Sequence, residues 1–191
     1  PPYGQKFKSG KSDRWGAIVG DDNAVETQER LRVALKGLRR NRHVYIFRGR
    51  LDLADLPLAG ATELIWDKEM IGMGDLSAPW GPQHEVIVFA TYEPSQASRA
   101  KGYGNLSARL RKGSVLRSLR ANGRAVKYHP TEKPVDILRQ LIESSSVFGE
   151  TVYDPFAGSG STLIAAALEC RKAVGCEIDE RYCEIAAKRF D

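Results

Sequence analysis

The sequence is poor in cysteine and lacks long apolar runs. Its three cysteines are Cys170, Cys176 and Cys183. Their odd number and their spacing fit neither a disulfide framework nor a zinc signature with paired ligands. The three histidines are also far apart in the sequence. We therefore expect reduced, partly buried thiols and no metal site.

No apolar run approaches the roughly 18 residues that a membrane-spanning helix needs. The start of the chain also lacks the charged and apolar regions of a secretory signal. The 191 residues, 42% of them hydrophobic, suffice for one domain with a proper core. These observations predict a single-domain, soluble, intracellular protein.

Acidic residues are missing between positions 94 and 131, although the whole chain contains 24. The basic residues of this stretch outnumber the formal net charge of +5, so the remainder of the chain is net acidic. We expect an inserted, partly irregular subregion that contacts anions; the alternative is a solvated basic face. The basic residues are Arg99, Lys101, Arg109, Arg111, Lys112, Arg117, Arg120, Arg124 and Lys127.

Hydrophobic periodicity predicts alternating strands and helices. Helices are expected over 26–42, 134–145, 161–169 and 180–190, and strands over 43–49, 61–68, 84–92, 151–154 and 172–177. A long loop is expected between the second and third strands. After position 134 the alternation is typical of a parallel sheet covered by helices.

The strongest local pattern is "VYDPFAGSGSTLIAAA" at 152–167. A strand ends at Asp154, and a turn with Gly158 and Gly160 leads into a helix whose free N–H groups point to the same place. This arrangement predicts a ligand-binding crevice. A phosphate-binding loop would need a lysine that is missing here, and the dinucleotide pattern GxGxxG is incomplete.

S-adenosylmethionine suits this crevice better than a nucleotide does. Its positively charged amino group favours an acid such as Asp154, and Glu177, at the end of the next strand, can accept both ribose hydroxyls. Ile178 could then lie against the adenine. The alternative is structural: the glycines only permit close helix packing, and Glu177 caps the last helix.

Two motifs together resemble the amino-methylating DNA methyltransferases of the permuted β class, which act on adenine N6 or cytosine N4. They are "HPTEKP" (129–134) and, further along the chain, "DPFAGSGST" (154–162). The catalytic signature of that family is Asp, Asn or Ser followed by Pro-Pro-Tyr, and "PPYG" at 1–4 matches its last three positions. The order of these motifs is that of the permuted class, and the likeness covers nearly the whole chain.

The resemblance implies a Rossmann-like α/β fold of S-adenosylmethionine-dependent methyltransferases, with a mostly parallel sheet flanked by helices. Residues 1–93 would form the catalytic half, 94–128 a basic target-recognition insertion, and 129–191 the cofactor-binding half of the same domain. In that family, further strands precede the Pro-Pro-Tyr turn. We therefore expect N-terminal strands that this sequence does not contain.

The resemblance also implies roles for individual residues. The side chain before Pro1 and the carbonyl of Pro1 would accept hydrogen bonds from the target amino group. Pro1 and Pro2 would fix the turn, and Tyr3 would stack on a flipped base. Thr131 and Lys133 would hold the carboxylate of the cofactor's methionine part. The remaining candidate cofactor residues are Asp154, Pro155, Phe156, Ala157, Gly158, Ser159, Gly160, Thr162, Glu177 and Ile178.

By this resemblance, the chain is an S-adenosylmethionine-dependent DNA methyltransferase, with adenine N6 favoured as the target. The alternatives are a cytosine-N4 methyltransferase and a truncated, non-catalytic DNA-binding fragment of the same fold. The nine basic residues would contact double-stranded DNA, and a homodimer and a cognate restriction endonuclease are compatible with the family. The implied location is the cytoplasm of a bacterium or an archaeon, or of the host of a phage.

Overall fold

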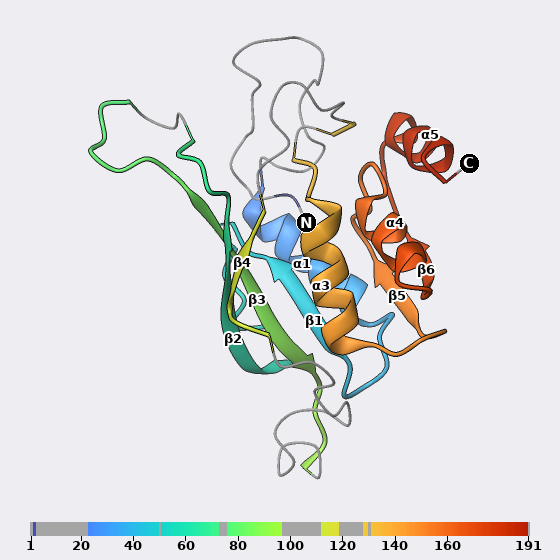
Figure 1. The fold of residues 1–191 in the computed structure, drawn as a ribbon. Coiled ribbons are helices and arrows are strands. Elements are labelled where there is room, and N and C mark those ends of the chain that lie inside the picture. Colours follow the sequence, from blue (N-terminus) through green and yellow to red (C-terminus); the bar gives the residue numbers. More distant parts are fainter. Residues whose placement is uncertain are drawn as a thin grey trace.

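The computed structural model describes Pro2 and residues 23–49, 51–72, 76–96, 112–118, 128–129 and 131–190. Figure 1 shows the elements in these ranges. None of the described helices has the length and the apolar content that crossing a bilayer requires. The helices are α1 (Ala24–Leu35), α3 (Val135–Ser145), α4 (Ser161–Leu168) and α5 (Glu180–Lys188). The strands are β1 (His43–Phe47), β2 (Leu58–Asp67), β3 (His84–Tyr92), β4 (Val115–Arg117), β5 (Thr151–Asp154) and β6 (Lys172–Gly175).

The first helix is shorter than its periodicity predicts. It is capped by Asn23, whose side-chain oxygen accepts the N–H groups of Val25 and Glu26, each at 3.1 Å. It ends at Leu35 rather than near position 42. At Asn41 the backbone has a φ of +65°, and its N–H donates to the carbonyl of Tyr92 at 2.8 Å. The segment after the helix is therefore held by strand β3 instead of continuing the helix.

One sheet contains four strands in the order β1-β3-β2-β4. Strand β3 pairs antiparallel with both β1 and β2, whereas β2 and β4 pair in parallel. Strands β1, β2 and β4 thus share one direction, but the sheet is mixed. The prediction of a mostly parallel sheet assigned no direction to this strand. Strand β3 is antiparallel to β2 because the chain turns back between them, and antiparallel neighbours need no crossover helix. Alternation within one strand reveals its buried face but not the direction of its partner.

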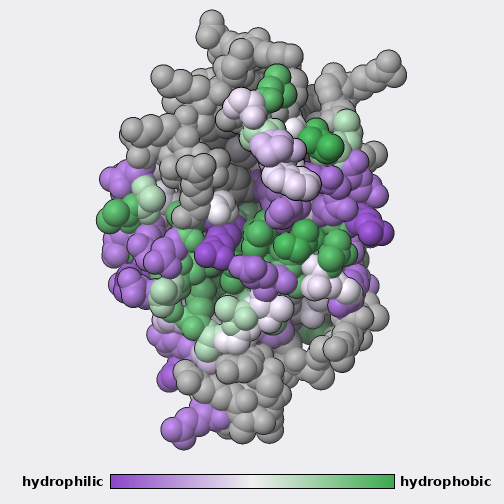
Figure 2. Space-filling model, turned by 90° about the vertical axis from the view of Figure 1, so that its left-hand side faces the viewer, coloured by the Kyte–Doolittle hydropathy of each residue, from purple (hydrophilic) through white to green (hydrophobic). Residues whose placement is uncertain are grey.

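The connection between β2 and β3 agrees with the expected loop and exposes large apolar side chains. Ile71, Leu76 and Trp80 are all mainly solvent-exposed. Figure 2 shows the side of the molecule that lies to the left in Figure 1, where hydrophobic residues form a band among hydrophilic ones. The sheet itself is covered on its other side, where the helices lie (Figure 1).

The second sheet consists of β5 and β6, which pair in parallel through the crossover helix α4. This is the predicted strand–helix alternation. Helix α3 joins the two sheets because both of its sides are apolar. Ile137 and Leu141 pack in a cluster with Trp66 of β2, whereas Leu138 and Ile142 pack against buried alanines of α4.

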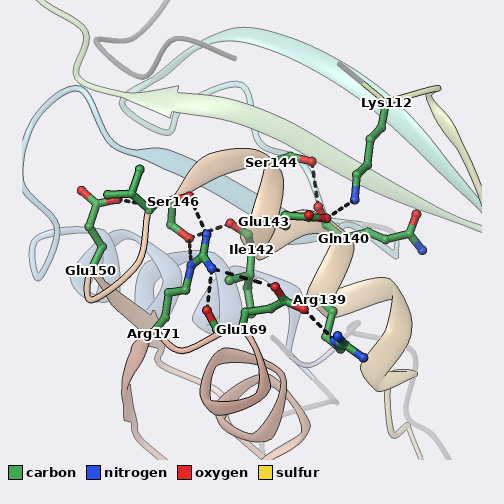
Figure 3. Close-up of polar contacts among 11 residues, drawn as sticks. Lys112, Arg139, Gln140, Ile142, Glu143, Ser144, Ser146, Glu150, Glu169 and Arg171 are labelled. Carbon is green, nitrogen blue, oxygen red and sulfur yellow. Dashed lines mark hydrogen bonds and ion pairs between the residues drawn. The ribbon is translucent and has the colours of Figure 1, made fainter. Parts of the chain in front are cut away.

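A polar network fixes the end of α3 against the turn between α4 and β6 (Figure 3). Arg171 donates from Nε to Oγ of Ser146 at 3.0 Å and from Nη2 to the carbonyl of Ser146 at 2.8 Å. Glu169 lies beside Arg171 and pairs with Arg139 of α3 at 2.7 Å. The Arg171 side chain is only 12% exposed, so this contact between the end of α3 and the turn before β6 is largely shielded from solvent.

Candidate functional site

A cavity of about 1400 Å³ extends between β1 and β5 and reaches the turn after β5. It is lined by parts of α1, β1, α3, β5 and the segment that contains "HPTEKP". In the described residues, β1 pairs only with β3, and β5 pairs only with β6. The predicted upstream strands stay a prediction. Most of the predicted cofactor residues line this cavity, together with Pro2.

The turn between β5 and α4 has a left-handed backbone at both glycines. Gly158 has a φ of +52° and Gly160 a φ of +83°, values that side chains disfavour. A Cβ added at Gly160 would lie 2.9 Å from the Cβ of Ala186 on α5, whereas one at Gly158 would lie 3.6 Å from the ring of His129. Gly160 therefore permits close packing of the turn against α5, which was the structural alternative for the glycines. Gly158, in contrast, borders the cavity.

The carboxylate of Glu177 holds this glycine turn. Its Oε2 accepts the N–H of Gly158 at 2.8 Å, and its Oε1 accepts the N–H groups of Ile178 and Asp179 at 2.9 Å each. A carboxylate offers about four lone-pair sites, so these bonds leave one, on Oε2, among the described contacts. Acceptance of one ribose hydroxyl therefore fits better than acceptance of both. Glu177 also supports the start of α5, as the structural alternative held.

Asp154 lies at the carboxyl end of β5 and lines the cavity. Its Oδ1 accepts the N–H of Phe156 at 3.0 Å, and its carbonyl accepts the N–H of Cys176 at 2.9 Å. The second carboxylate oxygen, Oδ2, has no hydrogen-bond partner within the described ranges. Asp154 therefore both shapes the turn and offers a negative oxygen to a cation in the cavity.

The segment around "HPTEKP" forms a compact turn beside the glycines. Nδ1 of His129 accepts the N–H of Thr131 at 3.2 Å and lies 3.1 Å from the Thr131 hydroxyl. The His129 ring packs on Tyr182 of α5, with 4.2 Å between ring centroids. Since Nδ1 accepts a hydrogen bond, the neutral ring carries its proton on Nε2.

Burial of the imidazole lowers the pKa of His129 from its ordinary value of 6.5, against the opposing effect of Glu177. The unfolded chain therefore takes up a proton more readily than the folded protein. We expect the contribution of the neutral His129 to the free energy of unfolding to be complete above about pH 6.5. This contribution should decrease as the pH falls towards the lower pKa of the folded state. Denaturation at about pH 7.5 and about pH 5.5 should show this difference in the free energy of unfolding.

In His129→Asn the difference between the two pH values should become smaller, because the group that titrates is removed. His84→Asn, at an exposed histidine, is the matched control and should keep the wild-type difference. An unaltered pH dependence in His129→Asn would contradict this account.

Lys133 is engaged within the protein. Its Nζ lies 3.2 Å from Oε2 of Glu85 and donates to the carbonyl of Thr131 at 3.1 Å. Lys68 also pairs with Glu85, at 2.9 Å, so two ammonium groups share one carboxylate. Lys133 and Thr131 line the cavity. The prediction that both residues hold a carboxylate stays open to test.

The other predicted cofactor residues occupy different environments. Phe156 packs against the core cluster of α1 and β1, and Ser159 is buried. Ile178 is 70% exposed, next to Glu177. Pro155, Ala157 and Thr162 line the cavity as well. Of the predicted catalytic residues, Pro2 lines the cavity, whereas Pro1 and Tyr3 lie outside the described residues.

Sequence reasoning missed Arg189 at the end of α5. Its Nη1 donates to the carbonyl of Ser159 at 2.8 Å and lies 3.0 Å from Oε1 of Glu132. An arginine in the last turn of a helix is common, since it complements the helix dipole. The sequence therefore offers no signal that distinguishes this arginine from the exposed Lys188 before it.

Two of the predicted DNA-binding residues lie in the described range 112–118. Lys112 forms an ion pair with Glu143 of α3, so its charge is partly used within the fold (Figure 3). Arg117 of β4 is 70% exposed and lies 3.7 Å from Asp67. The other seven, Arg99, Lys101, Arg109, Arg111, Arg120, Arg124 and Lys127, lie outside the described residues.

All three cysteines are free thiols, and they are exposed rather than partly buried. The expectation was wrong because strand β6 is open on one edge in the described structure and Cys176 directly follows it. Cys183 lies on the exposed side of α5, and Cys170 lies in the turn before β6.

The family model described as DNA methylase, for N6 and N4 methyltransferases, matches residues 1–188. Among curated proteins, the orphan methyltransferase M.BamHII of Bacillus amyloliquefaciens is 46% identical over 62 residues, which are 32% of this chain and 23% of that protein. The DNA adenine methyltransferase YhdJ of Escherichia coli K12 is 43% identical over 63 residues, 33% of this chain and 21% of that protein. The aligned part thus spans less than a quarter of either relative.

A solved structure supports the fold. The crystal structure of the M1.HpyAVI–SAM complex has a TM-score of 0.69 and 20% sequence identity, and the match covers 89% of this chain and 84% of that one. At this identity the likeness is one of fold, and it confirms the predicted α/β methyltransferase architecture. Because the family model spans nearly all residues, the chain belongs to the N6/N4 DNA methylase family.

Proposed function

We propose that the protein is an S-adenosylmethionine-dependent DNA methyltransferase that methylates the exocyclic amino group of a base rotated out of the duplex, with adenine N6 as the target. The observation on which this rests is the convergence of three segments on one cavity: residues 131–133, the turn 154–159, and Glu177. Family membership supports the reaction class. The adenine target is favoured by the similarity to a relative named DNA adenine methyltransferase.

The residues around the cavity suit the chemical groups of S-adenosylmethionine. Asp154 offers a carboxylate oxygen to its ammonium group, and the ammonium group of Lys133, which lines the cavity, suits its carboxylate. The open lone-pair site of Glu177 suits a ribose hydroxyl, and the exposed Ile178 suits the face of an adenine. The cavity of about 1400 Å³ is larger than the roughly 300–1,000 Å³ of typical small-molecule sites, so it has room for S-adenosylmethionine.

When bound, S-adenosylmethionine supplies a methyl group made electrophilic by its sulfonium. The protein's part is to make the amino nitrogen of the base nucleophilic, since its lone pair is delocalised into the ring. The Pro1 carbonyl would accept a hydrogen bond from this amino group and so localise the lone pair on the nitrogen. Tyr3 would stack on the flipped base and offset part of the few kcal/mol that flipping costs. Pro2 would fix the turn between them, because its ring restricts φ.

DNA contact is assigned to the basic stretch between 94 and 131, since clustered lysine and arginine release counterions from phosphates. Within the described part, Arg117 is the better candidate than Lys112, because its guanidinium is exposed and only distantly paired. A homodimer and a cognate restriction endonuclease stay predictions. The alternatives to the proposed target and activity are cytosine N4 and a non-catalytic DNA-binding fragment.

The proposal is tested by incubating the purified chain with radiolabelled S-adenosylmethionine and duplex DNA of mixed sequence. Transfer of label to DNA is the expected result, and mass spectrometry of the digested DNA should then detect N6-methyladenine. Detection of N4-methylcytosine would replace the target. Cofactor binding without transfer would favour the non-catalytic fragment, and absence of cofactor binding would overturn the proposal.

A further inference from the structure

An ion pair behind the glycine turn joins two ends of the cofactor-binding half. Nη1 of Arg189, the residue that caps α5, lies 3.0 Å from Oε1 of Glu132 in the "HPTEKP" motif. The two side chains are only 13% and 12% exposed. Burying charges is costly unless they are paired and hydrogen-bonded, so this pair is a specific feature of the fold.

The remaining contacts of Arg189 are with the glycine turn and with the residue before the motif. Nη1 donates to the carbonyl of Ser159 at 2.8 Å, to its hydroxyl at 3.0 Å, and to the hydroxyl of Ser161 at 3.3 Å. The guanidinium carbon lies 4.5 Å from the ring centroid of Tyr128. The side chain of Arg189 therefore contacts both the glycine turn and the segment that contains the motif.

Glu132 makes the reciprocal contacts. Its Oε1 accepts the hydroxyl of Ser161 at 3.2 Å, and its Oε2 accepts the N–H of Tyr128 at 3.0 Å. Glu132 and Ser161 line the cavity, whereas Arg189 is not one of the lining residues. An effect of Arg189 on a bound ligand must therefore act through the residues that it holds.

We propose that Arg189 and Glu132 are positioning residues, which hold residues 128–129 and 131–133 and the glycine turn 158–161 at a fixed separation. Ser159 belongs to this arrangement, because its hydroxyl and its carbonyl both accept from Arg189. As far as it concerns the cofactor, the inference rests on the proposed function. Loss of the pair would leave one buried charge without its partner and release the segment from the turn.

The test compares Arg189→Met with Lys188→Met by titration calorimetry with S-adenosylmethionine. Both variants lose one positive charge at the end of α5. Lys188, however, is 78% exposed, and its ion pair with Glu184 is long, at 4.0 Å. We expect a dissociation constant about tenfold weaker in Arg189→Met, since hydrogen bonds to charged groups are among the stronger ones. Lys188→Met should stay within about twofold of the wild type.

Conservative variants separate positioning from a general loss of stability. Arg189→Lys keeps the charge without the planar fork and should recover part of the affinity. Glu132→Gln keeps an accepting oxygen and should cost less than Arg189→Met. The double variant with Glu132→Gln and Arg189→Met should bind S-adenosylmethionine only slightly more weakly than Arg189→Met alone, as expected for two residues that act as a unit. Full additivity would contradict the pairing.

Hydrogen exchange of the cofactor-free protein gives a second readout. The amides of residues 128, 129 and 131–133 should exchange faster in Arg189→Met than in the wild type, with those of α3 unchanged. If the wild type binds the cofactor and Arg189→Met binds it equally well, the positioning role is overturned and the proposed function stands. If the wild type does not bind the cofactor, the proposed function fails, and unchanged exchange at residues 128, 129 and 131–133 would overturn the inference as well.

Discussion

Replacing Glu177 by alanine is expected to weaken the binding of S-adenosylmethionine by about a hundredfold or more. The substitution removes the acceptor of three backbone N–H groups, those of Gly158, Ile178 and Asp179. Hydrogen bonds to a charged group contribute roughly 1.5–3 kcal/mol each, and a hundredfold change in affinity corresponds to about 2.8 kcal/mol. Loosening the glycine turn together with losing one ligand contact suffices for this effect.

The matched control is Glu180→Ala, three residues further along. It removes the same charge from an exposed position in the first turn of α5, and calorimetry should find its affinity within about twofold of the wild type. Glu177→Gln tests the charge alone, because the amide keeps one accepting oxygen. We expect a loss of about tenfold in this variant. Wild-type affinity in Glu177→Ala would remove Glu177 from the site.

Gly160→Ala is expected to lower the free energy of unfolding by about 2–4 kcal/mol, the sum of two costs. The backbone has a φ of +83° at this position, which disfavours any side chain. The new methyl group would also lie 2.9 Å from the Cβ of Ala186, so α5 would have to move away from the turn. Urea denaturation monitored by circular dichroism measures the change.

Gly149→Ala isolates the backbone cost. Gly149 has a nearly identical φ of +79°, but an added Cβ would meet no atom within 4 Å. Its destabilisation should therefore be only about 1–2 kcal/mol. Adding Ala186→Gly to Gly160→Ala should recover part of the difference, because it removes the atom in contact. Equal effects at Gly149 and Gly160 would show that the contact between the turn and α5 is unimportant.

The core of the candidate site could be predicted because it is local. Strand β5, the glycine turn and helix α4 follow each other within one short stretch, and Glu177 comes two residues after strand β6. Residues so close in sequence have few ways to be arranged once strand and helix are known. The environment of Lys133 could not be predicted in this way, because Glu85 of β3 and Lys68, which follows β2, come from another part of the chain.

The direction of the strands was only partly predictable. The turn from β2 into β3 makes them antiparallel, although the helix–strand alternation after position 134 correctly predicts the parallel pair β5 and β6. A buried face and a period of two look the same in either pairing. Connection geometry, rather than the pattern within a strand, decides the arrangement.

By itself, the sequence determined the order of the motifs, the family, the glycine turn and the acids after it, because these depend on residue types at short, fixed spacings. Only the tertiary structure decided that Arg189 pairs with Glu132 and that Lys112 pairs with Glu143. A charged side chain has many oppositely charged residues elsewhere in the chain as potential partners. Its actual partner depends on which distant segments the packing of helices and sheets brings within a few ångströms.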